Sequence, residues 1–490
     1  MILQHQKSSL FYTLFGVLLA AGLTWASELQ IPSIPELETD AFENTKAAYE
    51  KAYADLNGDI TTGTFEQKAL LFHYTETLAH LYRQKGEMDE ALRYLEDLKR
   101  YIPLLKKAAE ETEDEDEKEG LLWSIAQKHS TFAIFGMYDD AIAVAKFSPM
   151  TGQYNASEYL ERVATIMASR ESFDKVVPVL DEAIAAAEEL PDIFWRECGI
   201  RDVAMLYTKA GRLQKARELV EPLSPYGKAC GLLNLADVLL KKGKDNPDRL
   251  PRLIVDILPL LWEAEPLAEL VLPDDRADIL QRVALRMIQM GKLKEGMQVF
   301  EKTSPENDPR RRDDFYTDVA CTLIEQGNFN EGETFVEKIE SPNYKARVLM
   351  YLIREAAIKS DIDTMKRLIP VAEPYLVDVE LLPHRLSHQL YLAAYKIRVG
   401  DEAEGRKMMD DLIDGPHREG LDRDWYIARS IYGLCYAGLY EEAVKKAETL
   451  STPGAKASAY QSIRTTWLQN EKPEEYKKMF QNWEVLEEVE

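Results

Sequence analysis

Five segments of this chain share one spacing of small residues: an Ala, a Gly seven positions later, and an Ala or Gly five positions after that. In an apolar helical pattern, the first small residue lets a second helix approach closely, and the Gly ends the first helix in a left-handed turn. The last small residue should lie where the second helix contacts the first. This spacing predicts stacked helical hairpins. The five triples are Ala79/Gly86/Ala91, Ala204/Gly211/Ala216, Ala284/Gly291/Gly296, Ala320/Gly327/Gly332 and Ala393/Gly400/Gly405.

The same register continues, less completely, in other parts of the chain. Gly136/Ala141 and Gly438/Ala443 keep its second half, and Ala236/Gly243 keeps its first half, while Ala164 and Ile353 begin degenerate copies. Units of roughly 32–50 residues are typical of helical-repeat families. We therefore expect an all-α fold, an α-α superhelical solenoid of about eleven helical hairpins.

A second signal separates one hairpin from the next. Pro disfavours helix in the residue before it, so a Ser-Pro or Thr-Pro pair predicts a helix boundary. Such pairs fall between successive units at Ser148-Pro149, Ser224-Pro225, Ser304-Pro305, Ser341-Pro342 and Thr452-Pro453.

These signals divide the chain into five segments. Five prolines interrupt the repeats between Lys244 and Asp275, which predicts a lengthened hairpin there. The predicted segments are a signal peptide (1–26), a short leader (27–45), N-terminal helical repeats (46–243), the Pro-rich long hairpin (244–275) and C-terminal helical repeats (276–490).

The first residues have the pattern of an export signal. Lys7 precedes an almost wholly apolar run, Leu10 to Leu23, and Ala26 offers a small residue for cleavage. An uncleaved membrane anchor is the alternative, although the run is short for a spanning helix. No later segment approaches spanning length, so we expect an exported protein, periplasmic or secreted, without a membrane span after cleavage.

The charge balance restricts the classes of partner. The chain carries 85 acidic and 60 basic residues, a formal net charge of −25. An acidic field repels nucleic acid and anionic membrane surfaces, so neither is an expected partner. The excess acid favours solubility or a basic partner. The run Glu110 to Glu117 fits capture of a basic partner or, more simply, a solvated helix end.

No motif points to catalysis, a metal or a cofactor. Asp55 to Glu66 has the oxygen spacing of a calcium loop but places Ile60 where that loop requires Gly. His384 and His388 share a helix face without a third ligand, and Asn155-Ala156-Ser157 is a glycosylation acceptor only in a eukaryotic source. We expect no cofactor, no metal and no enzymatic activity.

The four cysteines are expected to be free. Cys198 and Cys230 occupy the same register in successive units. Equivalent helices of neighbouring repeats lie about 8–10 Å apart, beyond the roughly 7 Å between Cα atoms that a disulfide allows. We predict four unpaired, mostly buried thiols.

The repeat pattern resembles the tetratricopeptide repeat over about residues 70–480. An aliphatic residue precedes the first small one, as at Leu78 and Val203, and an aromatic follows three residues after it, as at Tyr82 and Tyr207. Most units lack the family's early Trp, and several carry Gly where Ala is usual, so armadillo- or HEAT-like stacking is the alternative. The resemblance implies protein–protein contact through the concave face.

Residues flanking the packing Ala of each first helix are the candidates for that face. Several are cationic, which suggests a groove that receives carboxylates, for example from an acidic peptide segment or a C-terminus; scattered Arg side chains without a common ligand are the alternative. The candidates are His80, Arg83, Arg201, Met205, Gln281, Arg354 and Arg398, with Thr208 and Leu285 at equivalent positions.

Three functions follow from this pattern. The leading hypothesis is an exported, non-enzymatic scaffold that binds a protein or peptide on its concave face. The alternatives are an all-α toroid that acts on polysaccharide through paired carboxylates, and an envelope structural protein that self-assembles end to end.

Overall fold

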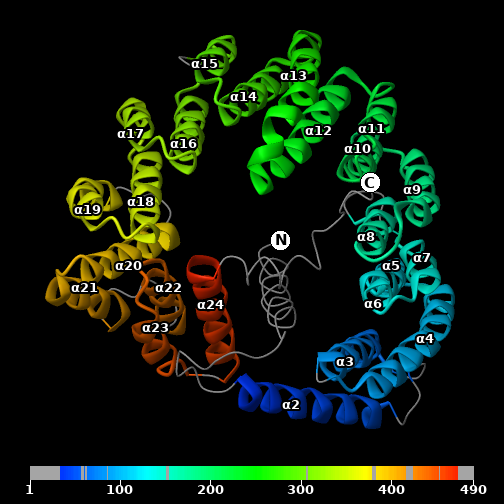
Figure 1. The fold of residues 1–490 in the computed structure, drawn as a ribbon. Helices are drawn as coiled ribbons and strands as arrows, with labels where there is room; N and C mark the ends of the chain where they lie inside the picture. The colour runs from blue at the N-terminus through cyan, green and yellow to red at the C-terminus, as the bar shows by residue number, and fades with distance from the viewer. Residues whose placement is uncertain are drawn as a thin grey trace. The chain divides into compact units, whose positions relative to one another are not determined.

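The fold is helical throughout the part of the chain that the structure describes. The computed structural model describes residues 34–56, 60, 63–84, 86–149, 154–304, 307–377, 382–414, 423–451 and 453–472. These residues contain helices and turns but no β-strand, which confirms the all-α class (Figure 1). The chain divides into two compact units, built mainly from Thr39–Arg286 (the N-terminal unit) and Met287–Met479 (the C-terminal unit).

In the N-terminal unit, consecutive helices pack in pairs, and first helices such as α8 and α10 form a layer beside second helices such as α9 and α11 (Figure 1). The helices up to the unit boundary, which falls inside α14, are α2 (Ile34–Asp55), α3 (Phe65–Gln84), α4 (Met88–Glu111), α5 (Glu115–Ala126), α6 (His129–Ile134), α7 (Tyr138–Ala145), α8 (Ala156–Ala168), α9 (Phe173–Glu188), α10 (Ile193–Lys209), α11 (Leu213–Val220), α12 (Pro225–Asp245), the 3₁₀ turn η1 (Pro247–Arg249), α13 (Leu250–Leu267), the 3₁₀ turn η2 (Ala268–Leu270) and α14 (Pro273–Gln289).

The C-terminal unit repeats the arrangement. Helices α16, α18, α20 and α22 each contact the next in the series and also a second helix, so the unit has two layers (Figure 1). Its helices are α15 (Leu293–Glu301), α16 (Pro309–Glu325), α17 (Phe329–Lys338), α18 (Pro342–Ile358), α19 (Ile362–Val377), α20 (Leu382–Arg398), α21 (Glu402–Asp414), α22 (Arg423–Tyr436), α23 (Tyr440–Ala447) and α24 (Pro453–Glu471).

The glycine-marked corners are confirmed. Each corner glycine has a positive φ, from 73° at Gly438 to 101° at Gly400, a conformation that costs Gly little. The residue after the glycine donates its N–H back across the turn, as from Arg212 to the Tyr207 carbonyl at 2.8 Å, which satisfies a carbonyl at the helix end. The glycines are Gly86, Gly136, Gly211, Gly291, Gly327, Gly400 and Gly438; Ser360, with φ 55°, takes this place in a degenerate copy.

The last small residue of a triple does lie where the second helix returns onto the first. A Cβ on Gly405 would come within 2.5 Å of the Ala393 carbonyl oxygen, and one on Gly332 within 3.1 Å of the Ala320 carbonyl oxygen. Both contacts join the two ends of a predicted triple. The spacing of small residues in these triples therefore indicates where the two helices of a hairpin cross closely.

Gly243 does not follow the predicted register. It lies inside α12, which continues to Asp245, rather than at a helix end. A Cβ there would lie 2.5 Å from Leu250 Cδ1, so this glycine lets α12 pack against the start of α13. The helices α12 and α13 form the lengthened hairpin that the prolines predicted; the five-segment division of the chain stays a prediction.

A carboxylate on the preceding first helix holds several of the linkers between hairpins, and two of these carboxylates, on Glu197 and Asp313, are buried. Glu197 accepts hydrogen bonds from the backbone and the hydroxyl of Ser224, at 2.7 and 2.8 Å. Asp313 accepts in the same way from the backbone N–H of Ser341. Asp424 accepts from the backbone N–H of Ser451, the residue before the Thr452-Pro453 linker. The Ser-Pro boundaries are therefore tied to the preceding first helix.

The cysteines are all free, as predicted, but only Cys230 and Cys435 are buried, whereas Cys198 and Cys321 are half-buried. None of the described helices is both long enough and apolar enough to cross a membrane.

Candidate functional site

Tyr and Arg side chains form one continuous series across the first helices of the C-terminal unit. The Arg354 guanidinium on α18 lies 4.6 Å from the ring centroid of Tyr351 and 5.7 Å from that of Tyr436 on α22. The Tyr436 ring meets Tyr391, on α20, edge to face at 5.5 Å. Three helices thus share one aromatic and cationic contact surface.

Arg429 extends the series along α22. It lies against the Tyr391 hydroxyl, where its charge and hydrogen bond partly oppose the rise in pKa that burial gives Tyr391. Its guanidinium also lies 5.5 Å from the Trp425 ring and 5.9 Å from the Tyr432 ring. We call this set the Tyr–Arg row; it consists of Tyr351, Arg354, Tyr391, Trp425, Arg429, Tyr432 and Tyr436.

Polar contacts fix the two ends of the Tyr–Arg row. At one end the Tyr351 hydroxyl donates to Glu325 Oε1 of α16 at 3.0 Å. At the other, the Tyr432 and Ser462 hydroxyls lie 3.0 Å apart, which ties the row to α24. The row therefore connects five consecutive first helices, α16 to α24. Rings held at both edges lose little conformational entropy on binding, since they are already ordered.

The charges along the row are unequally compensated. Arg354 donates to Glu355 at 3.2 Å, and although burial opposes its charge, Glu355 raises its pKa above the usual value. Its Nε is buried and has no hydrogen-bond partner among the described residues. No described carboxylate forms an ion pair with Arg429. The row therefore has cationic hydrogen-bonding capacity that its own unit does not use.

All seven residues of the Tyr–Arg row are half-buried. Side chains in this state are ordered by their neighbours yet keep a face in solvent. Tyr, Trp and Arg are the residue types that dominate binding energy at protein interfaces, because they combine large apolar area with a polar group. The arrangement can bind a peptide or protein surface; it has no nucleophile placed beside a base.

The residues predicted for the groove lie on first helices of both units. Arg354 belongs to the Tyr–Arg row, and Arg398, half-buried on α20, lies beside Gly438, where a Cβ would be 3.5 Å from the Arg398 Cζ. In the N-terminal unit, Met205 and Gln281 are half-buried, and Arg201 donates to Cys198 Sγ at 2.7 Å. These placements leave the groove assignment a prediction.

Among His80, Arg83 and Thr208, only Thr208 is contradicted by its burial, and His80 and Arg83 stay predictions. His80 Nε2 lies 3.1 Å from Thr131 Oγ1, and burial lowers its pKa, so its ring serves an interhelix contact. Arg83 lies over the Phe135 ring at 5.3 Å but is exposed. Thr208 was expected to face the groove; instead it is fully buried and donates to the Ala204 carbonyl.

Sequence reasoning missed six of the seven row residues. One signal was present: Tyr351 and Tyr391 each stand two positions before the packing residue of their helix, Ile353 and Ala393. An aromatic repeated at that register predicts a lateral stack between first helices.

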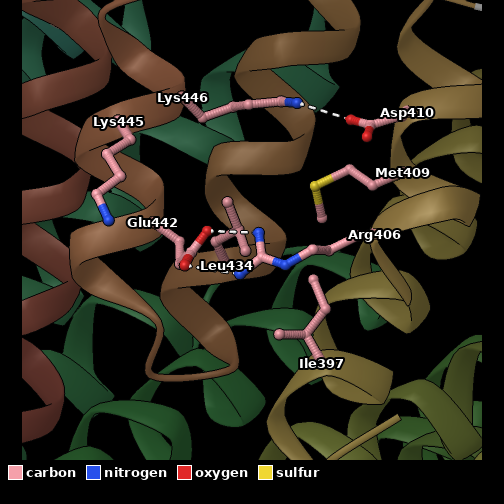
Figure 2. A pocket seen from close by; sticks show the side chains of 8 residues that line it. All are labelled: Ile397, Arg406, Met409, Asp410, Leu434, Glu442, Lys445 and Lys446. Carbon is pink, nitrogen blue, oxygen red and sulfur yellow. Dashed lines mark hydrogen bonds and ion pairs between the residues drawn. The ribbon is translucent and has the colours of Figure 1, made fainter. Parts of the chain in front are cut away.

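A small cavity of about 150 Å³ lies in the same unit, between α21 and α23 (Figure 2). Arg406 reaches across to Glu442 with two hydrogen bonds, at 2.8 and 2.9 Å, and Lys446 bonds Asp410 at 3.3 Å. Leu434, Ile397 and Met409 line its apolar part. The charged residues face each other across it, so it is an ion-paired contact between second helices.

The other candidate sites from the sequence are the His384/His388 pair, the calcium-like loop and the Asn155 triplet. Burial, with His384 and Arg347 nearby, lowers the pKa of His388 to about 4. Among the described residues no three His, Cys, Asp or Glu side chains converge as a metal site would require. Residues 57–59 and 61–62 of the calcium-like loop lie outside the described residues. Asn155 is buried and caps α8 by accepting from the Glu158 N–H.

Comparisons with known proteins leave the family open. No family model matches the chain, and no curated protein matches it. Among solved structures, Ton1535 from Thermococcus onnurineus NA1 is 15% identical, over 79% of this chain and 98% of that one, with a TM-score of 0.23. A circular tandem repeat protein with novel repeat topology and enhanced subunit contact surfaces is 14% identical, over 92% of this chain and 94% of that one, with a TM-score of 0.17.

Proposed function

We propose that this chain is a helical-repeat scaffold, without enzymatic activity of its own, that binds a protein or peptide along the Tyr–Arg row. The observation that carries the proposal is the unbroken contact series from Tyr351 through Arg354, Tyr436 and Tyr391 to Arg429. A repeat stack offers an extended surface because each hairpin presents equivalent side chains at a regular step. A partner lying across α18, α20 and α22 would contact all of them.

The partner's chemistry follows from the guanidinium groups. Arg binds carboxylates with paired, charge-assisted hydrogen bonds. Arg429 has no ion pair with a described carboxylate, and the Arg354 Nε has no partner within the described residues. We therefore propose a segment with aromatic or aliphatic anchors and at least one carboxylate, from an acidic side chain or a C-terminus.

Family and location belong to the same proposal. The small-residue crossings at Ala393/Gly405 and Ala320/Gly332 support a relationship with the tetratricopeptide repeat. The pattern Lys7, Leu10–Leu23 and Ala26 supports export to a periplasmic or extracellular compartment. N-terminal sequencing of the protein recovered from the periplasm or medium tests the cleaved signal: a chain that begins at Ser27 is expected, and one that retains the apolar run would support the uncleaved membrane anchor instead.

Site-specific photo-crosslinking in cells tests the binding surface. A photo-crosslinking amino acid replaces Tyr432 or Tyr436 of the row, and a matched protein carries it at Lys366, an exposed position of α19 in the second layer. Mass spectrometry then identifies the adducts. We expect a specific adduct from the row positions and none from Lys366.

Arg429→Glu completes the test. Its side chain is half-buried on a helix surface, so we expect stability to change by less than about 1 kcal/mol, while adduct yield falls at least tenfold. Equal adducts from row and control positions would contradict the proposal. Adducts made only with a second copy of the chain would instead support end-to-end self-assembly.

A further inference from the structure

The outer face of α13 and the turn after it, in the N-terminal unit, carry a cluster of strongly exposed apolar side chains. Among the large apolar side chains, four of the five most exposed lie within residues 255–272. Leu272 is 72% exposed, Val255 70%, Leu270 67% and Trp262 59%. Single exposed apolar residues are ordinary, but a cluster of this kind marks an interaction surface.

Helical geometry aligns much of this cluster. Val255, Pro259, Trp262 and Pro266 stand at successive spacings of four, three and four, so they share one face of α13. The opposite face is the core side, with Ile257, Leu260, Leu261 and Ala264 buried. We call the exposed set Val255, Pro259, Trp262, Pro266, Leu270 and Leu272 the α13 stripe. It lies in the second layer of its unit, on a surface separate from the first-helix layer.

An open groove runs along one side of the stripe. It has a volume of about 560 Å³ and lies between α11 and α13. Val255 and Pro259 form one wall, and Leu213 with the stem of Arg217 lies on the other. An amphipathic helix binds by laying its apolar face against apolar side chains of a groove. Trp262, on the same face of α13 as Val255 and Pro259, adds an exposed aromatic ring for that contact.

The charges at the groove select the partner. Arg217 and Lys228 both pair with Glu263, at 2.5 and 2.9 Å, and Lys228 also pairs with Glu221 at 2.8 Å, so the two cations are balanced by two carboxylates. Asp256 has no ion pair among the described residues. Glu218 pairs with Lys215 at 3.8 Å and accepts a long hydrogen bond from the neutral Gln214 amide at 3.5 Å. The groove is therefore left with uncompensated negative charge.

From this we infer a second docking site: the α13 stripe and its groove bind an amphipathic helix that carries Lys or Arg beside its apolar face. The uncompensated carboxylates would face those cations, while Trp262 and Val255 enter the apolar face of the helix. A second copy of this chain fits less well, since two α13 stripes would bring Asp256 and Glu218 of both copies together.

A designed peptide tests the inference directly. The probe is a fluorescently labelled helix of Leu and Lys, about five turns long, with one apolar face; its matched control has Glu in place of every Lys. Anisotropy titrations with the full-length protein should show saturable binding of the Lys peptide, and at least tenfold weaker binding of the Glu peptide.

Variants separate this site from non-specific attraction to an acidic protein. Trp262→Glu should weaken binding of the Lys peptide at least tenfold, and Asp256→Arg with Glu218→Arg should reverse the preference between the peptides. Val371→Glu, a half-exposed apolar position on α19 in the other unit, is the control and should leave binding unchanged. These positions are exposed, so circular dichroism should show intact folding.

Two results would overturn the inference. One is equal binding of the Lys peptide to wild type, Trp262→Glu and Val371→Glu. The other is a concentration-dependent dimer in sedimentation that Trp262→Glu abolishes, because it would assign the stripe to a second copy.

Discussion

Asp313 Oδ2 accepts a hydrogen bond from the backbone N–H of Ser341 at 2.7 Å, and this bond joins the start of one hairpin to the start of the next. The same oxygen accepts from the Glu340 N–H at 3.1 Å, and Arg312 pairs with the other oxygen. Asp313 is 2% exposed. A buried carboxylate thus satisfies backbone donors at a boundary where Pro342 begins the next helix, so each hairpin fixes the start of its successor.

Asp313→Ala should therefore destabilise the C-terminal unit by about 2 kcal/mol. The substitution leaves the part-buried N–H groups of Glu340 and Ser341 without their acceptor, while Arg312 keeps its ion pair with Glu340 at 2.8 Å. A buried donor without an acceptor costs roughly 1–3 kcal/mol. Urea unfolding followed by circular dichroism measures the change. Asp424→Ala removes the equivalent contact to Ser451 at a more exposed place, and should cost less than half as much. Equal losses would show that burial does not set the value of this contact.

Gly405→Ala tests the helix crossing. The new methyl group would lie 2.5 Å from the Ala393 carbonyl oxygen and 3.0 Å from the Ile397 backbone nitrogen, and neither atom can rotate away. Overpacking of this kind costs roughly 1–3 kcal/mol. Gly332→Ala is the matched control, because its closest contact, at 2.8 Å, is the flexible Ile324 side chain. We expect a clearly larger fall in melting temperature for Gly405→Ala, and a smaller fall would contradict the crossing geometry.

The corners were predictable because the information is local. A left-handed turn needs a residue that tolerates positive φ, and that requirement falls on Gly86, Gly211 or Gly327 alone. The crossing contacts were predictable for the same reason, since both ends of a triple lie in one hairpin. The predicted register is wrong at Gly243 because α12 continues past it to Asp245, and the start of α13, at Leu250, packs against this glycine.

The Tyr–Arg row was mostly unpredictable because it depends on contacts between hairpins. Tyr391 and Tyr436 meet only because α20 and α22 stack with a particular lateral offset. Small residues specify that two helices approach, but not how far one repeat is shifted against the next. That offset results from the summed packing of many side chains. Arg354 is the one row residue among the groove candidates, because its position in the repeat places it on the face of the first helix where the row lies.

The stability contributed by Glu161 and Asp202 in the N-terminal unit should fall as pH rises from about 4 to about 7. Burial, with Asp202 nearby, raises the pKa of Glu161 to about 7, and burial likewise raises the pKa of Asp202 to about 6. A carboxyl whose pKa is higher in the folded state than in the unfolded state holds its proton longer when folded. Its contribution is complete below the unfolded pKa, near 4.5 for Glu, and is lost as pH rises towards 7.

Glu161→Gln isolates this effect. The amide keeps the shape and stays neutral, so the variant should melt higher than wild type at about pH 8 and no higher at about pH 5. Thermal melts across this range measure the difference. A constant difference would show that Glu161 does not titrate there. Glu158→Gln, on the same helix, is the control: its carboxylate pairs with Arg162 at 2.5 Å, and its removal should add no such upward trend.

The ion pair between Glu76 and Lys128 should be strongly coupled to folding of the N-terminal unit. Lys128 Nζ lies 2.6 Å from Glu76 Oε2, both side chains are buried, and the Thr131 hydroxyl donates to the other carboxylate oxygen. Burial alone would raise the pKa of Glu76, but Lys128 and these hydrogen bonds outweigh it and hold the pKa below its usual range. The stabilisation is therefore present above about pH 4.5 and is lost as pH falls below it.

Glu76→Gln should destabilise the unit by about 3–5 kcal/mol at pH 7, since it leaves the Lys128 ammonium buried without a counter-charge. The double variant Glu76→Met with Lys128→Met removes both charges and fills similar volume, so it should recover most of that loss. Urea unfolding of wild type, single and double variants gives the comparison. If the double variant is as unstable as Glu76→Gln, the network stabilises through its hydrogen bonds to Thr131 rather than through charge compensation. Recovery to near wild-type stability would show that the pair adds little net stability, which supports a role in fixing the register of α3 against α6.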